Sequence, residues 1–138
     1  GDVEKMELPF GKEYFDCILY GDVLEHLVDP WKILNQHCKF LQKGGYVVMS
    51  IPNIAHYRTI KMLWRKEWNY VDMGILDSTH LRFFALRNIE SMISNAGLEI
   101  IKMKRKISAS NSKKFFNRIL GGALIEYMTE QYIIVARK

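Results

Sequence analysis

The strongest constraint on the fold is an apolar run that stops at a polar cluster and is followed by a helix start. The run covers Phe15–Tyr20, with apolar residues at both parities, which predicts a parallel strand covered on both faces. Asp29 followed by Pro30 marks a helix start, because Asp caps free N–H groups and Pro suits the first helical position. Apolar residues repeat at helical spacing over residues 31–41, and a second buried strand is expected over Tyr46–Ile51. This order predicts a strand–helix–strand unit with a parallel crossover.

The rest of the chain alternates in the same way. Gly44-Gly45 is expected to end the first helix, and Gly97 a later one. The further expected elements are a helix over residues 57–65, a helix over 86–96, a strand over 98–106, a helix over 113–127 and a closing strand over 131–137. This alternation predicts an open α/β sheet in a single domain over residues 1–138, with residues 54–84 as a less regular insert.

Composition limits the class of protein. The chain has 138 residues, of which 49% are hydrophobic and 25% charged, as in one globular domain with a real core. No apolar stretch reaches the roughly 20 residues of a membrane helix and no signal peptide is visible, so a cytoplasmic location is expected. The start at Gly1 is interpreted as that of a trimmed chain or fragment. Cys17 and Cys38 form no C-x-x-C pair and are expected to be two buried thiols.

The net charge of +5 leaves the choice of partner open. Much of the excess lies in residues 102–106 and 113–118. A basic balance can favour nucleic acid or an anionic membrane surface. No RNA-binding aromatic motif or glycine-rich clamp accompanies it, so nucleic acid is not expected. A solvated face is favoured over a surface for an anionic substrate or a lipid.

Three segments carry a resemblance to a known family. These are "GDVEKMELPF", "FDCILYGDVLEHLVDPWKILNQHCKFLQKGGYVVMSIPN" and "LDSTHLRFFALRNIESMISNAGLEI". Their order is similar to that in the second half of class I S-adenosylmethionine-dependent methyltransferases, including members that act on glycans, lipids or quinones. The resemblance implies a partial Rossmann-like fold, mainly parallel with an antiparallel closing strand, that lacks the family's N-terminal strand and glycine-rich turn. The isolated chain is therefore expected to bind the cofactor weakly and to be inactive.

The resemblance also implies site residues. Asp2 would bond the adenine amino group and Val3 would pack on the ring, while Gly21 permits close backbone approach. A base assists a hydroxyl acceptor, and histidine suits that task near neutral pH. The candidate cofactor-binding residues are Asp2, Val3, Tyr20, Gly21, Asp22 and Leu24; the candidate catalytic residues are Glu25, His26 and His80; the candidate substrate-binding residues are Asn53, His56 and Arg82.

A metal is the less favoured hypothesis for the same cluster. Asp22-x-x-Glu25-His26, with His80 later, resembles a pattern in some metal-assisted O-methyltransferases. Glu25, His26 and His80 would hold a divalent ion that lowers the pKa of the acceptor hydroxyl. The favoured alternative is that Glu25 and His26 cap the next segment and orient the substrate without a metal.

The leading interpretation is a methyltransferase fragment that acts on a small-molecule, glycan or lipid-linked acceptor, at a hydroxyl. Half of a nucleotide-binding oxidoreductase is a second interpretation, which the absence of a glycine fingerprint disfavours. A non-catalytic Rossmann-like interaction module is a third. Without the family's first strand, the strand over Phe15–Tyr20 has a bare edge, which predicts self-association.

Overall fold

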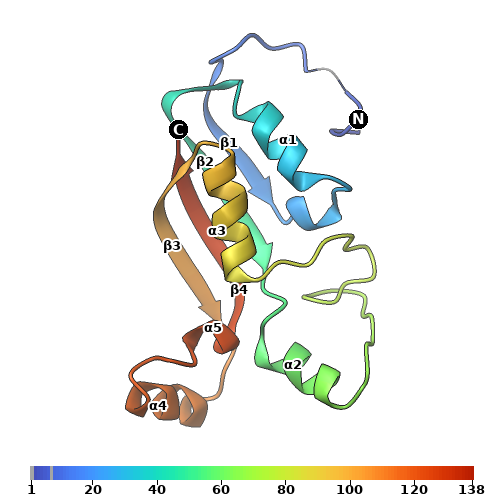
Figure 1. The fold of residues 1–138 in the computed structure, drawn as a ribbon, viewed down its shortest axis with the longest axis vertical. Helices are drawn as coiled ribbons and strands as arrows, with labels where there is room; N and C mark the ends of the chain where they lie inside the picture. Colours follow the sequence, from blue (N-terminus) through green and yellow to red (C-terminus); the bar gives the residue numbers. More distant parts are fainter. Residues whose placement is uncertain (1, 7) are drawn as a thin grey trace.

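The computed structural model describes residues 2–6 and 8–138, and it describes only the backbone of residues 113 and 116. The chain folds into a four-stranded sheet with helices against it and at one end (Figure 1). The elements are β1 (Phe15–Gly21), η1 (Leu24–His26), α1 (Pro30–His37), β2 (Leu41–Pro52), α2 (Tyr57–Trp64), α3 (Leu86–Asn95), β3 (Glu99–Ile107), α4 (Asn111–Ile119), α5 (Ile125–Met128) and β4 (Thr129–Arg137). Within the described residues, no helix has the length and apolar character needed to span a bilayer.

The sheet has the predicted mixture of parallel and antiparallel strands. Its strand order is β1-β2-β4-β3, with β1 and β2 parallel and β4 antiparallel to both β2 and β3. The prediction of an antiparallel closing strand is therefore confirmed. Because β1, β2 and β3 run in the same direction, their carboxyl ends lie at one rim, and β4 starts at that rim.

The helices cover only one face of the sheet. α1 and α3 lie on the same side (Figure 1), and their buried side chains pack with those of the inner strand faces. The inner core includes Ile33, Leu34, Met49, Ile89, Ile93 and Ile134. On the outer face Leu19 is 71% exposed, and Tyr46 and Ile133 are also exposed. The expectation that β1 is covered on both faces is wrong here, because both helices pack on the same side.

The two cysteines differ in burial because the helices cover only one face of the sheet. Cys38 is buried, whereas Cys17 is exposed on β1, and both are free thiols. Cys17 pairs in register with Tyr46, whose side chain also belongs to the outer face. The expectation of two buried thiols therefore holds only for Cys38.

Two pairs of glycines act differently from the sequence-based expectation. α1 ends at His37, and Gly44-Gly45 lies inside β2 rather than at a helix end. A Cβ on Gly45 would lie 3.0 Å from the Asp16 carbonyl oxygen, so glycine permits the close approach of β2 to β1 there. Gly121 and Gly122 have φ angles of 62° and 86° and divide the expected helix over residues 113–127 into α4 and α5.

Candidate functional site

A cavity of about 290 Å³ opens at the carboxyl rim of the sheet. Residues after β1 and at the ends of β2 and β3 line it, together with the start of β4 and part of the insert. Its lining residues are Asp22, Glu25, His26, Pro52, Gly74, Ile75, Asp77, His80, Lys106, Glu130 and Gln131. Open α/β sheets bind ligands at this rim, so the cavity is the candidate site.

Asp22 connects three strands at the floor of this cavity. Its backbone N–H donates to the Ser50 hydroxyl over 3.0 Å, and that hydroxyl donates to Asp22 Oδ1 over 2.8 Å. The Gln131 amide donates to the same carboxylate oxygen. Asp22 has a φ of 51°, a left-handed conformation that turns the chain sharply after β1. A Cβ on the preceding Gly21 would meet nothing within 4 Å, so the strand end offers open backbone to a ligand.

Glu25 is a buried acid without a side-chain partner. Its side chain belongs to a residue that is 1% exposed, and both carboxylate oxygens lack a hydrogen-bond partner among the described residues. Burial raises the pKa of Glu25 to about 7, and the Asp22 charge adds to this rise. The Glu25 backbone carbonyl accepts from Leu81 N–H at 2.8 Å and Arg82 N–H at 2.9 Å, which fastens the insert to the rim. The site therefore holds an acid that titrates near neutral pH.

His26 and His80 lie beside this acid with their rings 4.8 Å apart. Nδ1 of His26 lies 3.2 Å from the Thr79 carbonyl oxygen, and Nδ1 of His80 lies 3.1 Å from the Ile75 carbonyl oxygen. Since a carbonyl only accepts, we assign the proton of each neutral ring to Nδ1, which leaves the lone pair on Nε2. Ligand-type atoms of Glu25, His26 and His80 all lie within 4.8 Å of one another. This set can accept a proton or donate electron pairs to a cation.

Four of the candidate residues have buried side chains outside the cavity. Tyr20 Oη lies 2.7 Å from His37 Nδ1, and Leu24 is part of the core. The Asn53 amide donates to the carbonyls of Glu126 and Thr129, both over 2.8 Å. His56 is fully buried at the start of α2 and contacts the Tyr57 ring. In this structure these side chains hold elements together.

Arg82 also contacts the protein rather than the cavity. Its guanidinium donates through Nε and Nη2 to the Val28 carbonyl, with Nε 2.9 Å from the oxygen. Val28 lies in the loop before α1, so Arg82 joins the insert to that loop. A hydrogen bond also joins the two ends of the insert: Ile54 N–H donates to the Phe84 carbonyl over 2.9 Å.

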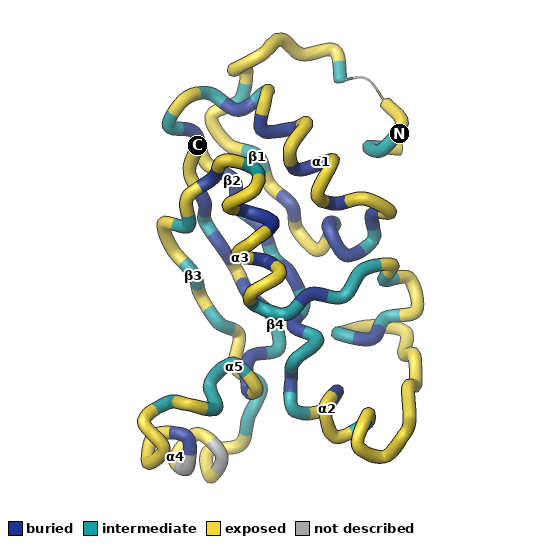
Figure 2. The backbone as a smooth tube through the Cα atoms, viewed as in Figure 1, coloured by how far each residue is buried: buried dark blue, intermediate teal, exposed yellow. Residues whose placement is uncertain are grey.

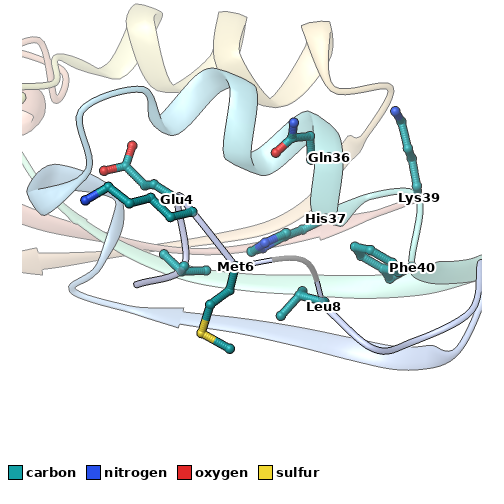
Figure 3. Close-up of a pocket in the computed structure, with 9 residues that line it drawn as sticks. Glu4, Met6, Leu8, Gln36, His37, Lys39 and Phe40 are labelled. Atoms are coloured by element: carbon teal, nitrogen blue, oxygen red, sulfur yellow. The ribbon is translucent and has the colours of Figure 1, made fainter. Parts of the chain in front are cut away.

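The N-terminal segment forms a different cavity. This cavity, of about 440 Å³, lies between residues 3–6 and 8 and the end of α1 (Figure 3). Val3 lines it, whereas Asp2 lies outside it and pairs with Lys5 at 2.9 Å. The Glu4 carboxylate accepts from two backbone N–H groups of the loop before α1. Neither Asp2 nor Val3 lines the rim cavity.

Several lining residues were not among the sequence-based candidates. Lys106, Glu130 and Gln131 reach the cavity from β3 and β4. The sequence could have indicated the residues of β4, because an antiparallel closing strand begins at the rim where the parallel strands end. The first residues of β4 therefore had to lie near the ends of β1 and β2.

Comparisons with known proteins agree with this geometry. A family model described as a methyltransferase domain matches residues 2–103, and the chain belongs to this family. A curated relative, ubiquinone biosynthesis O-methyltransferase of Shewanella sp. (strain ANA-3), is 23% identical over 87 residues, which are 63% of this chain and 37% of the relative. The aligned part thus spans little more than a third of that relative.

Solved structures show the same fold. A protein of Bacillus halodurans assigned as a methyltransferase superposes with a TM-score of 0.64 at 20% identity, over 100% of this chain and 75% of its own. An S-adenosylmethionine-dependent methyltransferase of Thermotoga maritima superposes with a TM-score of 0.64 at 18% identity, over 100% of this chain and 62% of its own. The sheet order and the rim described above are therefore those of a Rossmann-like methyltransferase fold.

Proposed function

We propose that the chain forms part of the active site of an S-adenosylmethionine-dependent methyltransferase that modifies a hydroxyl of a small molecule, a glycan or a lipid-linked acceptor. One observation carries the proposal: in a methyltransferase-family chain, an unpartnered buried Glu25 lies beside His26 and His80 at the ligand-binding rim. A non-catalytic interaction module has no need of such a buried acid, and the match of residues 2–103 to a methyltransferase domain disfavours half of an oxidoreductase.

The cofactor side of the proposed site lies at the end of β1. Bound S-adenosylmethionine supplies the methyl group from a positively charged sulfonium. The open backbone at Gly21 provides room for close approach, and the Asp22 carboxylate provides a negative charge nearby. Asp2 and Val3 stay candidates for the adenine end, although they do not line the rim cavity.

The acceptor side of the proposed site is formed by the acid and the two histidines. Methyl transfer is a direct displacement, so the protein mainly aligns the acceptor oxygen and excludes water. His26 or His80, through Nε2, accepts the proton of the hydroxyl, which assists by about 10²–10⁴-fold. Glu25 adjusts the charge at the base, because its pKa of about 7 lets it gain or release a proton in the working range. The curated relative's name, which specifies O-methylation, supports oxygen as the acceptor atom.

Transfer of a labelled methyl group tests the proposal. The natural full-length protein is incubated with radiolabelled S-adenosylmethionine and a panel of phenols, catechols, sugars and polyprenylated catechols. We expect transfer to at least one hydroxyl compound, and a loss of about 10²–10⁴-fold in kcat for the base among His26→Ala and His80→Ala. Lys12→Gln, on the exposed surface outside the cavity, is the control. Folded protein without transfer to any acceptor, or transfer unaffected by both histidine variants, would refute the assignment.

A metal-assisted version is the second candidate, and one observation favours it. The ligand-type atoms of Glu25, His26 and His80 lie within 4.8 Å of one another, and the Nδ1 atom of each histidine contacts a carbonyl, as in many ligating histidines. The unpartnered Glu25 carboxylate also fits a cation. Such a divalent ion would lower the pKa of the acceptor hydroxyl. Chelation tests this version: we expect EDTA to abolish transfer and a divalent ion that suits imidazole ligands, Fe²⁺ or Zn²⁺, to restore it, and unchanged activity would exclude it.

A further inference from the structure

The charge of the molecule is concentrated in two segments. Residues 54–66 and 100–125 contain eleven of the 20 Lys and Arg residues and none of the 15 Asp and Glu residues. The rest of the chain is acidic, with nine basic residues against fifteen acidic ones. These two segments include α2 and α4, which project at the same end of the molecule (Figure 1). The Lys and Arg residues of α2 and α4 thus gather at one end, whereas those of β3 extend along the sheet and Arg105 pairs with Glu126 of α5 at 2.7 Å.

The same end exposes large apolar side chains. On and after α2, Trp64 is 87% exposed and Met73 is 81% exposed. On α4, Phe115 is 67% and Ile119 is 65% exposed. Ile60, Leu63, Tyr70, Val71, Leu120 and Tyr127 extend this set of exposed apolar and aromatic side chains. Figure 2 shows α2 and α4 largely in the colour of exposed residues.

The α2 part of this surface is continuous with α5. An open, apolar groove of about 560 Å³ is lined by Tyr57, Ile60, Lys61, Trp64, Arg65 and Tyr127. Tyr127 lies in α5, the next helix after α4 along the chain, so the groove extends from α2 to α5. Lys61 of α2 and Arg65, which caps the end of that helix, are one turn apart, and both are exposed residues that line the groove.

We propose that this end, defined by α2, α4 and Tyr127, docks on an anionic lipid bilayer. Interfacial helices bind membranes by inserting Trp, Phe and Leu while Lys and Arg contact anionic headgroups, and this surface presents both kinds of side chain. The Lys and Arg residues of α2 and α4 give this end an excess of positive charge, which would also orient the molecule toward negative lipids. The proposal does not rest on the proposed methyl transfer.

The side-chain chemistry favours a bilayer over other anionic partners. Single-stranded nucleic acid requires cations and aromatic stacking, but it offers no environment for Met73, Ile119 or Leu120. An acidic protein would require a shaped and mostly rigid interface, whereas these side chains come from two short helices and the loops that follow them. A bilayer accepts them without a matching shape, because headgroups and acyl chains adapt to the inserted side chains.

Vesicle cosedimentation with the folded, natural full-length protein tests the docking. The probes are vesicles of phosphatidylcholine alone and of phosphatidylcholine mixed with an equal amount of phosphatidylglycerol. We expect binding only to the mixed vesicles, weakened by salt. Lys61→Gln with Arg65→Gln is expected to weaken binding about thirtyfold, and Trp64→Ser with Phe115→Ser about tenfold or more. Both pairs are exposed, so circular dichroism should show an unchanged fold.

Two matched controls make the assignment specific. Lys12→Gln with Lys43→Gln removes the same charge outside the two basic segments, and Leu19→Ser removes an apolar side chain from the open sheet face. We expect both controls to bind the mixed vesicles within about twofold of the original protein. Equal binding to neutral and anionic vesicles, no binding to either, an effect of the controls as large as that of the α2 and α4 variants, or binding to polyuridylic acid but not to vesicles would each overturn the proposal.

Discussion

The two faces of the sheet are made from the same four strands but have opposite environments. On β4, Ile134 is completely buried against α1 and α3, whereas its neighbour Ile133 is 39% exposed on the outer face. On β1, Tyr20 is buried and Leu19 is 71% exposed. Apolar residues at both parities are usually a sign of burial on both faces. Here the strands carry apolar side chains on both faces of the sheet, but the described residues cover only one of these faces.

The difference shows which contacts hold the described fold together. The inner face joins two helices that are distant in sequence through one continuous cluster of buried side chains. The outer face contributes strand-forming residues but little burial. Substitutions of strand residues that face the helices should therefore lower the free energy of unfolding strongly. Substitutions of strand residues on the outer face should change it little.

The largest effect should separate adjacent residues of β4. Ile134→Ala is expected to cost about 3 kcal/mol of unfolding free energy, because it removes a buried side chain and leaves a cavity. Ile133→Ala, the matched control, is expected to cost under about 1 kcal/mol because its side chain already contacts water. Urea unfolding of both variants measures the difference. Equal losses would mean that the outer face is as well packed as the inner one.

A second effect concerns the buried acid at the rim. The pKa of Glu25 is raised to about 7 from its ordinary value of 4.5, so below pH 4.5 both the folded and the unfolded state hold the proton. As the pH rises toward 7, the unfolded state releases the proton first, and the folded state loses stability. Glu25→Gln removes this loss, and should be more stable than the original protein by about 3 kcal/mol above pH 7.

Urea unfolding at low and at slightly alkaline pH, with EDTA present, measures this linkage. The control is Glu13→Gln, which changes an exposed acid in the turn before β1. A stability gain for Glu25→Gln that is the same at both pH values would show that Glu25 is not held neutral by burial.

Local signals account for most of the fold that the sequence predicts. The strand at Phe15 and the helix start at Asp29-Pro30 depend on neighbours within a few residues, and both are confirmed. Gly44-Gly45 misled the prediction of the helix end, because the same residue type also permits two strands to approach closely. Coverage of the sheet could not be predicted from strand composition, since it depends on where both helices pack.

The candidate site also contains residues that local patterns predicted and contacts that they could not predict. Asp22, Glu25, His26 and His80 all line the rim cavity, as their positions after a strand or in the insert suggested. Asn53 also follows a strand, but its amide bonds to carbonyls 73 and 76 residues away, which no local pattern encodes. Gln131 meets Asp22 across 109 residues, and only the antiparallel direction of the closing strand could have indicated that contact.

The open face and edge of β1 should also have a measurable effect. Within the part of the chain that the structure describes, β1 pairs with β2 on one edge and with no strand on the other. We expect the chain to self-associate through this side, and Leu19→Lys to weaken the association about tenfold by placing a charge there. Light scattering over a range of concentrations measures the change, with Leu63→Lys on α2 as the control. A monomer mass independent of concentration would contradict the expectation.

The smallest effect should come from the cap of α1, the helix that covers the inner side of β1 and β2. The Asp29 side chain accepts from Lys32 N–H over 3.0 Å, which satisfies one of the free donors at the helix start. Asp29→Ala is expected to cost about 1 kcal/mol, and Asp29→Asn less, because Asn keeps an oxygen acceptor at the same place. Asp16→Ala, an exposed acid on β1, is the control and should cost under about 0.5 kcal/mol. If urea unfolding gave the same loss for Asp29→Ala and Asp29→Asn, the contribution would be the charge near the helix dipole rather than the hydrogen bond, because Asn keeps only the bond.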